Sequence, residues 1–362
     1  MMHITEIRTR AVSVPLDIPI ISAIRRSERV ELVVIDVLTD NGLVGQSYVQ
    51  TFGMHQARAV RSIVAYLADV LRGQSAVLTL RCWQMMDRAI NLLGRGGIAT
   101  FALSGIDCAL WDIVGKVTQT PVAVLLGAAG DNCTAYQSAG LWLEDPTPAL
   151  AEQAVELLQP GFQGVKMRVG RAHPDADEAA AHMIRAAIGP GHLLMIDANQ
   201  AWSVGQAIGI GRTLEAVQPL WIEEPVDHDD FAGHAEVARA LTAPIATGEN
   251  VYMPHGFQHL LDAQACDVVM PDVQRVGGVT GWMRVAALAE ARRLPIASHL
   301  FPEISVHLLA ASPTAHILEY MPWAQPIMAE KLVIQNGAAY VPPRPGLGLV
   351  FDDAAIERFA FE

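Results

Sequence analysis

Three consecutive segments of the chain read HLLMID (residues 192–197), PLWIEE (219–224) and APIATGE (243–249). Each is a short apolar run that closes on acidic residues. Runs this apolar are typical of strands buried on both faces, as in a parallel sheet that is covered by helices. The helical stretches between the runs supply the crossover connections that parallel strands need. The segments therefore predict consecutive strands of an α/β domain.

The same pattern extends in both directions along the chain. FQGVKMRV (162–169) precedes these segments, and DVVMP (267–271), PIASH (295–299) and AHILE (315–319) follow them. A helical stretch, PALAEQAVELLQ (148–159), separates the earliest strands. The repetition predicts a modified (β/α) barrel of the TIM type, with seven or eight strands, over residues 126–325.

The first third of the chain has a different organisation. VELVVIDVL (30–38) is rich in β-branched residues and leads into Asp40-Asn41-Gly42, a strong hairpin signal. From about residue 55 to 117 apolar residues recur at spacings of three and four, which predicts helices. Residues 1–125 are therefore expected to form a separate α+β domain.

Composition excludes several classes of function. The formal net charge of −13 disfavours a nucleic-acid partner, because phosphate binding needs clustered Lys and Arg. The sequence contains no uncharged apolar run of 18 residues and no signal-peptide pattern, so we expect a cytoplasmic protein without a membrane partner. The four cysteines are scattered without CxxC pairs, and we expect free thiols rather than a disulfide or zinc framework.

The acidic residues at the strand ends suggest a metal site. The carboxyl ends of parallel barrel strands meet at one mouth, which would bring Asp197, Glu223 and Glu249 together. Three unpaired carboxylates at close range repel one another, and their hard oxygen ligands suit Mg²⁺. The alternative is that each acid separately forms a salt bridge or caps a helix.

One earlier strand carries a pair of cations. Lys166 and Arg168 are two residues apart, so both side chains leave the strand on the same face, toward the barrel mouth. Such a pair can hold a substrate carboxylate. Like-charge repulsion is expected to lower the pKa of Lys166 and to make it a usable base. The alternative is a solvated basic edge.

Two further strand ends carry a candidate catalytic pair. Asp272 and His299 follow consecutive strands, where a carboxylate can accept a hydrogen bond from one imidazole nitrogen and leave the other as a base. The alternative for a lone histidine is a satisfied core residue. The neighbouring aspartate favours catalysis.

The motifs resemble the mandelate racemase branch of the enolase superfamily along nearly the whole chain. The similar segments are GVKMRVG (164–170), MIDANQAW (195–202), WIEEP (221–225), TGEN (247–250), VVMPDVQRVGGVTGW (268–282), SHLFPEISVHLLAASPTAHILE (298–319), RTRAVSVPL (8–16) and ALWDIVGK (109–116). The resemblance implies that the N-terminal domain, together with the C-terminal segment 326–362, caps the barrel. It also implies an Mg²⁺ ion, a small hydroxy-carboxylate substrate and a homo-oligomer.

The resemblance further implies a role for each site residue. The family removes the proton alpha to a carboxylate and stabilises an enediolate intermediate. The expected roles are proton abstraction by His299 with Asp272, contact with the substrate carboxylate by Lys166, contact near the alpha-hydroxyl by Asn199, proton donation by Glu319, lining of the site by Ser138, and metal binding by Asp197, Glu223 and Glu249.

Arg168 departs from the family pattern for racemases. Racemases of this branch carry at this position a lysine that serves as the second base. An arginine, with a pKa above about 12, is a poor proton acceptor at neutral pH. Two-base racemisation is therefore disfavoured, whereas a path with one base, His299, and departure of a β-hydroxyl stays open.

The loop ISAIRRSERVE (21–31) is the second departure, because this loop sets specificity in the family. Arg25 and Arg26 are expected near the entrance, Gln50 replaces an aromatic wall residue, and Phe52 keeps one. A hydroxylated or dicarboxylic acid fits these residues better than a phenyl group does. The alternative is that both arginines are solvated loop charges.

The leading hypothesis is a dehydratase that converts an aldonate or aldarate to its 2-keto-3-deoxy acid. The first alternative is a racemase or epimerase of an alpha-hydroxy acid. The second, from another class, is a non-catalytic homologue that binds a metal or a ligand.

Overall fold

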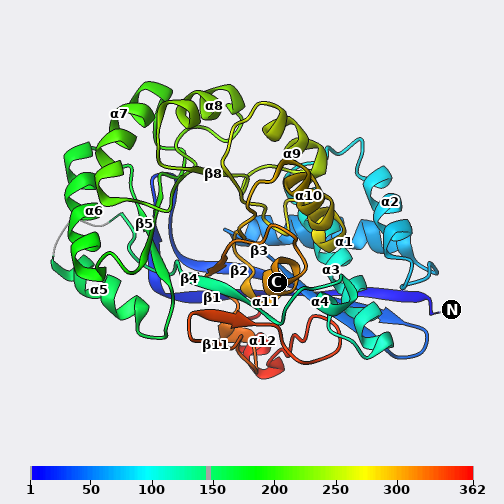
Figure 1. The fold of residues 1–362 in the computed structure, drawn as a ribbon. Helices are drawn as coiled ribbons and strands as arrows, with labels where there is room; N and C mark the ends of the chain where they lie inside the picture. Colours follow the sequence, from blue (N-terminus) through cyan, green and yellow to red (C-terminus); the bar gives the residue numbers. More distant parts are fainter. Residues whose placement is uncertain (1, 144–147, 362) are drawn as a thin grey trace.

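The computed structural model of the protein describes residues 2–143 and 148–361. The chain begins with a three-stranded antiparallel sheet in the order β1 (Ile4–Ile21), β2 (Arg26–Thr39) and β3 (Val44–Thr51). The turn between β2 and β3 lies at the predicted Asp40-Asn41-Gly42 position, where Gly42 has a φ of +83°. β1 and β2 are the long strands of this sheet, and the end at which they join reaches the barrel part, where the Leu143 N–H donates to the Ile21 carbonyl oxygen at 2.8 Å. Both strands are drawn in blue in Figure 1.

Helices α1 (Met54–Leu71) and α3 (Ile98–Thr118) pack against this sheet. Helix α2 (Thr79–Ala89) packs on α1 and α3, and the short α4 (Val122–Leu125) contacts α3. Within the described ranges α3 is the one helix long and apolar enough to cross a membrane by length and composition, but 78% of its apolar window is buried inside the protein. It contacts β3, α1, α2 and α10 (Gly278–Arg292), which is the environment of a core helix.

The second part of the chain is a barrel. Its parallel strands are β4 (Asn132–Gln137), β5 (Gly164–Arg168), β6 (Leu193–Asp197), β7 (Trp221–Glu223), β8 (Ile245–Thr247), β9 (Val268–Val269) and β10 (Leu318–Tyr320). Strand β10 pairs with β4, and residues 296–299 bridge the gap between β9 and β10 through isolated pairs. The predicted α/β fold with a TIM-type barrel is confirmed. The PIASH segment, expected as a regular strand, forms only these isolated bridges.

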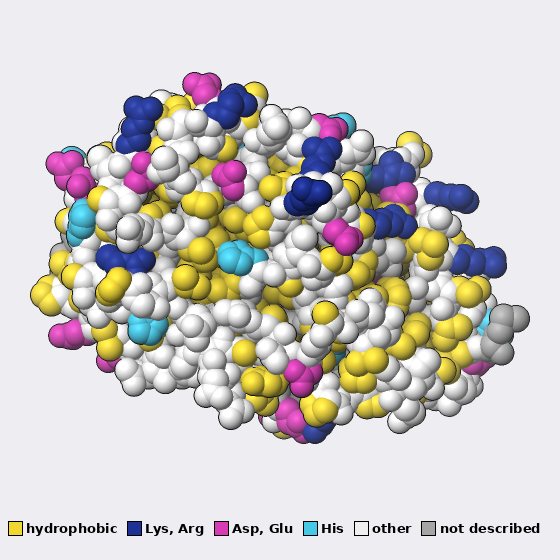
Figure 2. All heavy atoms as spheres, viewed as in Figure 1, with side chains coloured by type: hydrophobic (Ala, Val, Ile, Leu, Met, Phe, Trp, Pro, Cys, Tyr) yellow, Lys and Arg dark blue, Asp and Glu magenta, His cyan; other side chains and the backbone are white. Residues whose placement is uncertain are grey.

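Helices surround the barrel strands (Figure 1). They are α5 (Pro148–Leu158), α6 (Pro174–Ile188), α7 (Val204–Leu214), α8 (Phe231–Ala240), α9 (Met253–Asp262), α10 and α11 (Pro302–Ala310). On the face of the molecule that Figure 2 shows, apolar side chains lie over the centre and charged side chains lie mainly around the rim.

The C-terminal segment contacts both parts of the molecule. Strand β12 (Ala338–Tyr340) pairs with β11 (Ile334–Gln335) and also lies antiparallel to β4 of the barrel. Helix α12 (Asp353–Phe359) packs on β1. The segment therefore joins the barrel sheet before it returns to the N-terminal sheet.

The strand register sets the level of the site. Arg168 lies opposite Asp197 on β5 and β6, and Asp197 lies opposite Glu223 on β6 and β7. Because adjacent parallel strands end at the same height, these side chains reach the mouth together. Below them Tyr136 and Trp221 are fully buried and fill the barrel interior.

Candidate active site

Three carboxylates meet at the mouth of the barrel. Asp197 and Glu223 close their strands, and Glu249 follows β8 by two residues. All three are buried, and one oxygen from each lies within 4.8 Å of the others. Burial and the neighbouring acids raise the pKa of Glu223 well above its ordinary value. A buried, oxygen-only cluster of this kind fits a hard divalent cation such as Mg²⁺.

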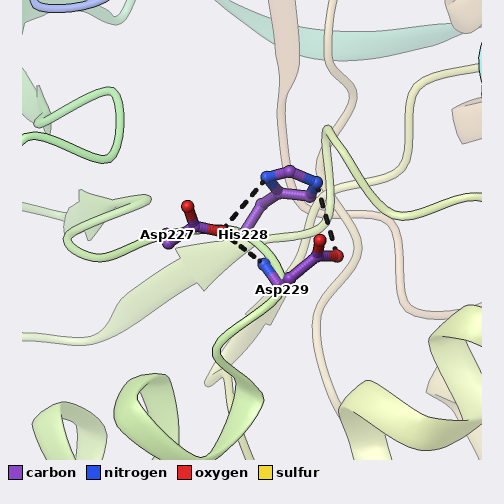
Figure 3. A group of neighbouring side chains, drawn as sticks. All are labelled: Asp227, His228 and Asp229. Atoms are coloured by element: carbon purple, nitrogen blue, oxygen red, sulfur yellow. Dashed lines mark hydrogen bonds and ion pairs between the residues drawn. The ribbon is translucent and has the colours of Figure 1, made fainter.

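A second group of possible ligands lies in the loop after β7. Asp227, His228 and Asp229 are consecutive, and both aspartates are exposed. Figure 3 shows them held to one another on the loop. The Nδ1 of His228 also lies 2.9 Å from the Gln200 amide oxygen. Exposed acids of this kind are common without an ion, so the buried group is the better metal site.

Lys166 lies at the bottom of the pocket in the barrel mouth, which we call the floor, and carboxylates surround it. Its Nζ donates to Glu223 Oε1 at 2.8 Å and lies 2.8 Å from Glu319 Oε1. Burial disfavours its charge, but attraction to Glu223 and Glu319 outweighs burial and raises the pKa of Lys166 well above its ordinary value. The expectation of a lowered pKa was wrong, because acids from other strands outweigh the one cation on its own strand.

Arg168 is held by oxygens at the end of β4. Its Nη1 donates to the backbone oxygens of Ser138 and Gly140 at 2.6 and 3.0 Å, and its Nη2 donates to the Ser138 hydroxyl at 2.8 Å. The guanidinium stacks on Trp142 at 3.9 Å. The side chain is therefore fixed as a permanent cation at the edge of the pocket.

Asp272 and His299 form the expected pair. The Nδ1 of His299 lies 2.8 Å from Asp272 Oδ2, and its Nε2 lies 3.4 Å from Glu249 Oε2, beside the metal site. Burial disfavours the imidazolium, but Glu249 and Asp272 outweigh burial and raise the pKa of His299. The bond to Asp272 leaves Nε2 as the nitrogen that faces the pocket.

Arg275 belongs to this arrangement, although it was not predicted from the sequence. Its Nη1 donates to Asp272 Oδ2 at 3.0 Å and to the backbone oxygen of Glu249 at 2.9 Å. It therefore braces both the base and a metal ligand. Its place three residues after Asp272 in the VVMPDVQRVGG motif was the available signal.

Glu319 and Asn199 also line the pocket. Although burial opposes ionisation of Glu319, Lys166 and His299 lower its pKa to about 2, so the side chain is ionised here. Its role as a proton donor stays a prediction. Asn199 has a positive φ of 44°, a conformation that asparagine tolerates well, and its buried amide oxygen has no partner among the described residues.

The remaining predicted substrate-binding residues divide into two groups, those that line the pocket and those that do not. Arg25 and Phe52 line the pocket, with the guanidinium 4.4 Å from the ring centroid. Ser138 is buried behind Arg168, Gln50 is buried with its backbone N–H bonded to Gln274, and Arg26 is exposed. None of these three is among the lining residues that the structure describes.

The pocket spans both parts of the molecule. Its lining includes further side chains that were not predicted from the sequence: Ile20, Ser22, Ile24, Trp142, Asn250, Leu300, Met321 and Trp323. Trp142 and Trp323 follow the strand ends of β4 and β10, so their position after a predicted strand was the signal for them.

Comparison with known families matches both parts of the chain. Residues 4–127 match the mandelate racemase / muconate lactonizing enzyme N-terminal domain, and residues 149–355 match the enolase C-terminal domain-like family. L-talarate/galactarate dehydratase from Salmonella typhimurium is 33% identical over 90% of this chain and 82% of its own length. The 3,6-anhydro-alpha-L-galactonate cycloisomerase from Streptomyces coelicolor is 34% identical over 91% of both chains.

A solved structure agrees closely with the fold. An enolase from Bradyrhizobium, complexed with magnesium and mandelic acid, aligns with a TM-score of 0.94 and 34% identity over 100% of this chain and 99% of its own. The buried acids, the Asp272–His299 pair and these matches lead to one assignment. The chain is an enzyme of the mandelate racemase / muconate lactonizing enzyme family, within the enolase superfamily.

Proposed function

We propose that the protein dehydrates an acid sugar to a 2-keto-3-deoxy acid, with His299 as the base and Mg²⁺ as the cofactor. The observation that carries this proposal is the state of Arg168. Both terminal nitrogens of its guanidinium already donate hydrogen bonds, and an arginine does not release its proton at neutral pH. A single base suits removal of one alpha proton followed by loss of a β-hydroxyl.

Asp197, Glu223 and Glu249 would hold the ion. When bound there, Mg²⁺ supplies Lewis-acid stabilisation of the charge that develops on the substrate carboxylate. Lys166, whose ammonium is kept by its buried acidic neighbours, supplies a second positive charge at the same floor.

The base acts from the side of the pocket that His299 occupies. Asp272 accepts from Nδ1, so Nε2 can take the alpha proton, and Asp272 stabilises the imidazolium that forms. That imidazolium can then return the proton to a hydroxyl that leaves from the same face. These two proton transfers release water and leave an enol, which becomes the 2-keto-3-deoxy acid when C3 takes a proton from solvent and the enol hydroxyl gives one up. Neither transfer needs a second base on the Arg168 side.

A screen of aldonic and aldaric acids tests the proposal. With Mg²⁺ present, we expect a 2-keto acid product from at least one acid sugar. His299→Asn should reduce turnover by about 10²–10⁴-fold, the usual contribution of a general base. His182→Asn is the matched control, since that histidine is half exposed on α6. Undiminished turnover in His299→Asn would rule the mechanism out.

The second candidate is a racemase or epimerase of an alpha-hydroxy acid. The mandelic acid in the related Bradyrhizobium structure favours it. Exchange of the alpha proton with deuterated solvent separates the two candidates. Comparable exchange in both enantiomers of one acid supports racemisation, whereas exchange in one stereoisomer alone supports dehydration through His299. A homo-oligomeric state and a cytoplasmic location stay predictions.

A further inference from the structure

We infer that Arg25 binds an anionic group at the far end of the substrate, so that the preferred acid sugars are dicarboxylates (aldarates) rather than aldonates. The inference rests on the proposed function, because it takes the first carboxylate to lie at the metal site. It adds a second anion site, at the rim of the same pocket.

Arg25 is placed by a short turn between β1 and β2. The N–H of Ser22 donates to the Arg25 carbonyl oxygen at 2.8 Å, which closes the turn. The guanidinium lies over Phe52, and its Nη1 donates to the Phe52 carbonyl oxygen at 3.4 Å. Phe52 in turn packs edge-on against Trp323, with ring centroids 5.8 Å apart. Aromatic packing therefore holds the cation at the entrance.

The other cations of the pocket already have strong partners. Lys166 lies against Glu223 and Glu319, and Arg275 donates to Asp272. Arg168 donates to oxygens of residues 138 and 140. Among the described residues, no carboxylate lies within ion-pair distance of Arg25, whose one hydrogen bond to a carbonyl is long. Within residues 2–143 and 148–361, its capacity to bind an anion is therefore unused.

Charge also varies with depth in the pocket. The acids of the described lining are Asp197, Glu249 and Glu319, and all three are buried at the barrel mouth. The rim contributes Arg25 beside Ile24, which is 61% exposed. A linear acid sugar with its first carboxylate on the floor can extend its other end toward this rim, because Arg25 lines the same pocket. An anion there meets one free cation and no acid of the described lining.

The chemistry favours a carboxylate over a phosphate. A guanidinium fork matches the two oxygens of a carboxylate, whereas phosphate sites usually gather several donors. A terminal CH₂OH would gain only a neutral hydrogen bond from the same side chain. A distal phosphate shares the negative charge, so the experiment includes it as a separate arm.

The test measures kcat/KM for a six-carbon aldarate, the matching aldonate and its 6-phosphate, with Mg²⁺. We expect the aldarate to be preferred. Arg25→Gln should lower kcat/KM for the aldarate by about 10–100-fold, as expected for loss of a charge-assisted hydrogen bond, and for the aldonate by less than about threefold. Arg25→Lys should keep part of the preference. Arg26 is exposed and lies outside the pocket lining, so Arg26→Gln is the control and should keep the full preference for the aldarate.

Binding measurements test the distal site without turnover. Calorimetry on Mg²⁺-loaded His299→Asn should give tighter binding of the aldarate than of the aldonate, and Arg25→Gln in that background should remove the difference. Equal loss for both acids, or a wild-type preference for the aldonate, overturns the role of Arg25. Preference for the 6-phosphate overturns the carboxylate assignment. Selective binding without any dehydration would instead contradict the proposed function and leave the distal site supported.

Discussion

At the scale of single residues, the chemistry of a side chain depends on partners that are distant in sequence. Lys166 and Arg168 were predicted to share a face of one strand, and they do. Their electrostatic state could not be predicted from that strand, because Glu223 and Glu319 come from β7 and β10. Strand-end position predicts that such residues share the barrel mouth, but which acid contacts which cation depends on the register of the closed barrel, and no local pattern encodes that register.

Arg168 gives a prediction at this scale. Arg168→Lys keeps the charge but cannot form the fork of hydrogen bonds to Ser138 and Gly140 or the same stacking on Trp142. We expect kcat/KM to fall by about 10–100-fold. Steady-state kinetics with Arg168→Met alongside give the comparison. Wild-type turnover in the lysine variant would mean that charge alone matters.

At the scale of elements, α3 of the N-terminal part is hydrogen-bonded to the first turn of α10 of the barrel. Asp107 on α3 accepts from the backbone N–H and the hydroxyl of Thr280 at 2.8 and 2.7 Å. Nearby, Trp83 Nε1 donates to the Gly277 carbonyl oxygen. The helices themselves could be predicted from apolar spacing. Their contact could not, because the residues involved are more than 170 positions apart.

This contact predicts a pH dependence of stability. Burial, only partly offset by Thr280 and Arg284, raises the pKa of Asp107 to about 7 from an ordinary value of 3.8. The folded state therefore binds the proton more tightly than the unfolded state. The stability that Asp107 contributes is complete below pH 3.8 and is lost as pH rises through about 7.

The measurement compares the wild type with Asp107→Asn. The amide mimics the protonated acid, so the free energy of unfolding of the wild type relative to the variant should fall between about pH 4 and 7, by on the order of 4 kcal/mol at most. It should level off above about pH 7. Denaturant titrations at several pH values give the difference, and a constant difference across this window would contradict the assignment.

At the scale of the whole molecule, the barrel was predictable because alternating apolar strands and helices leave few other architectures, whereas the cap was expected only from the family resemblance. The order in which the C-terminal segment contacts the barrel and the N-terminal sheet was harder to predict from the sequence. Strand β12 adds to the barrel sheet beside β4 before α12 reaches β1. Strands as short as β11 and β12 have too few residues to show a period, so the sequence pattern does not reveal them.

Metal binding should stabilise the whole molecule. Asp197, Glu223 and Glu249 come from three successive strands and repel one another inside the barrel. Mg²⁺ binds the folded state alone, so saturation should raise Tm by a few degrees, and chelation should abolish turnover until Mg²⁺ is restored. Asp197→Asn should lose the Tm shift. Asp229→Asn, in the exposed loop group, should retain the Tm shift. Loss of the shift in Asp229→Asn and its retention in Asp197→Asn would mean that the ion binds at the loop instead.

The pocket is assembled from two separable stretches of chain. Arg25 and Phe52 come from the first 52 residues, whereas every acid and the histidine of the site follow residue 190. On the proposed role of Arg25, recognition of the distal end of the substrate and the proton-transfer chemistry are encoded in different parts of the chain. We expect a chimaera with the first domain of a relative on this barrel to change the preference for the distal group and to keep the carboxylate cluster and the Asp272–His299 pair. Diversification can then proceed by exchange of the N-terminal domain.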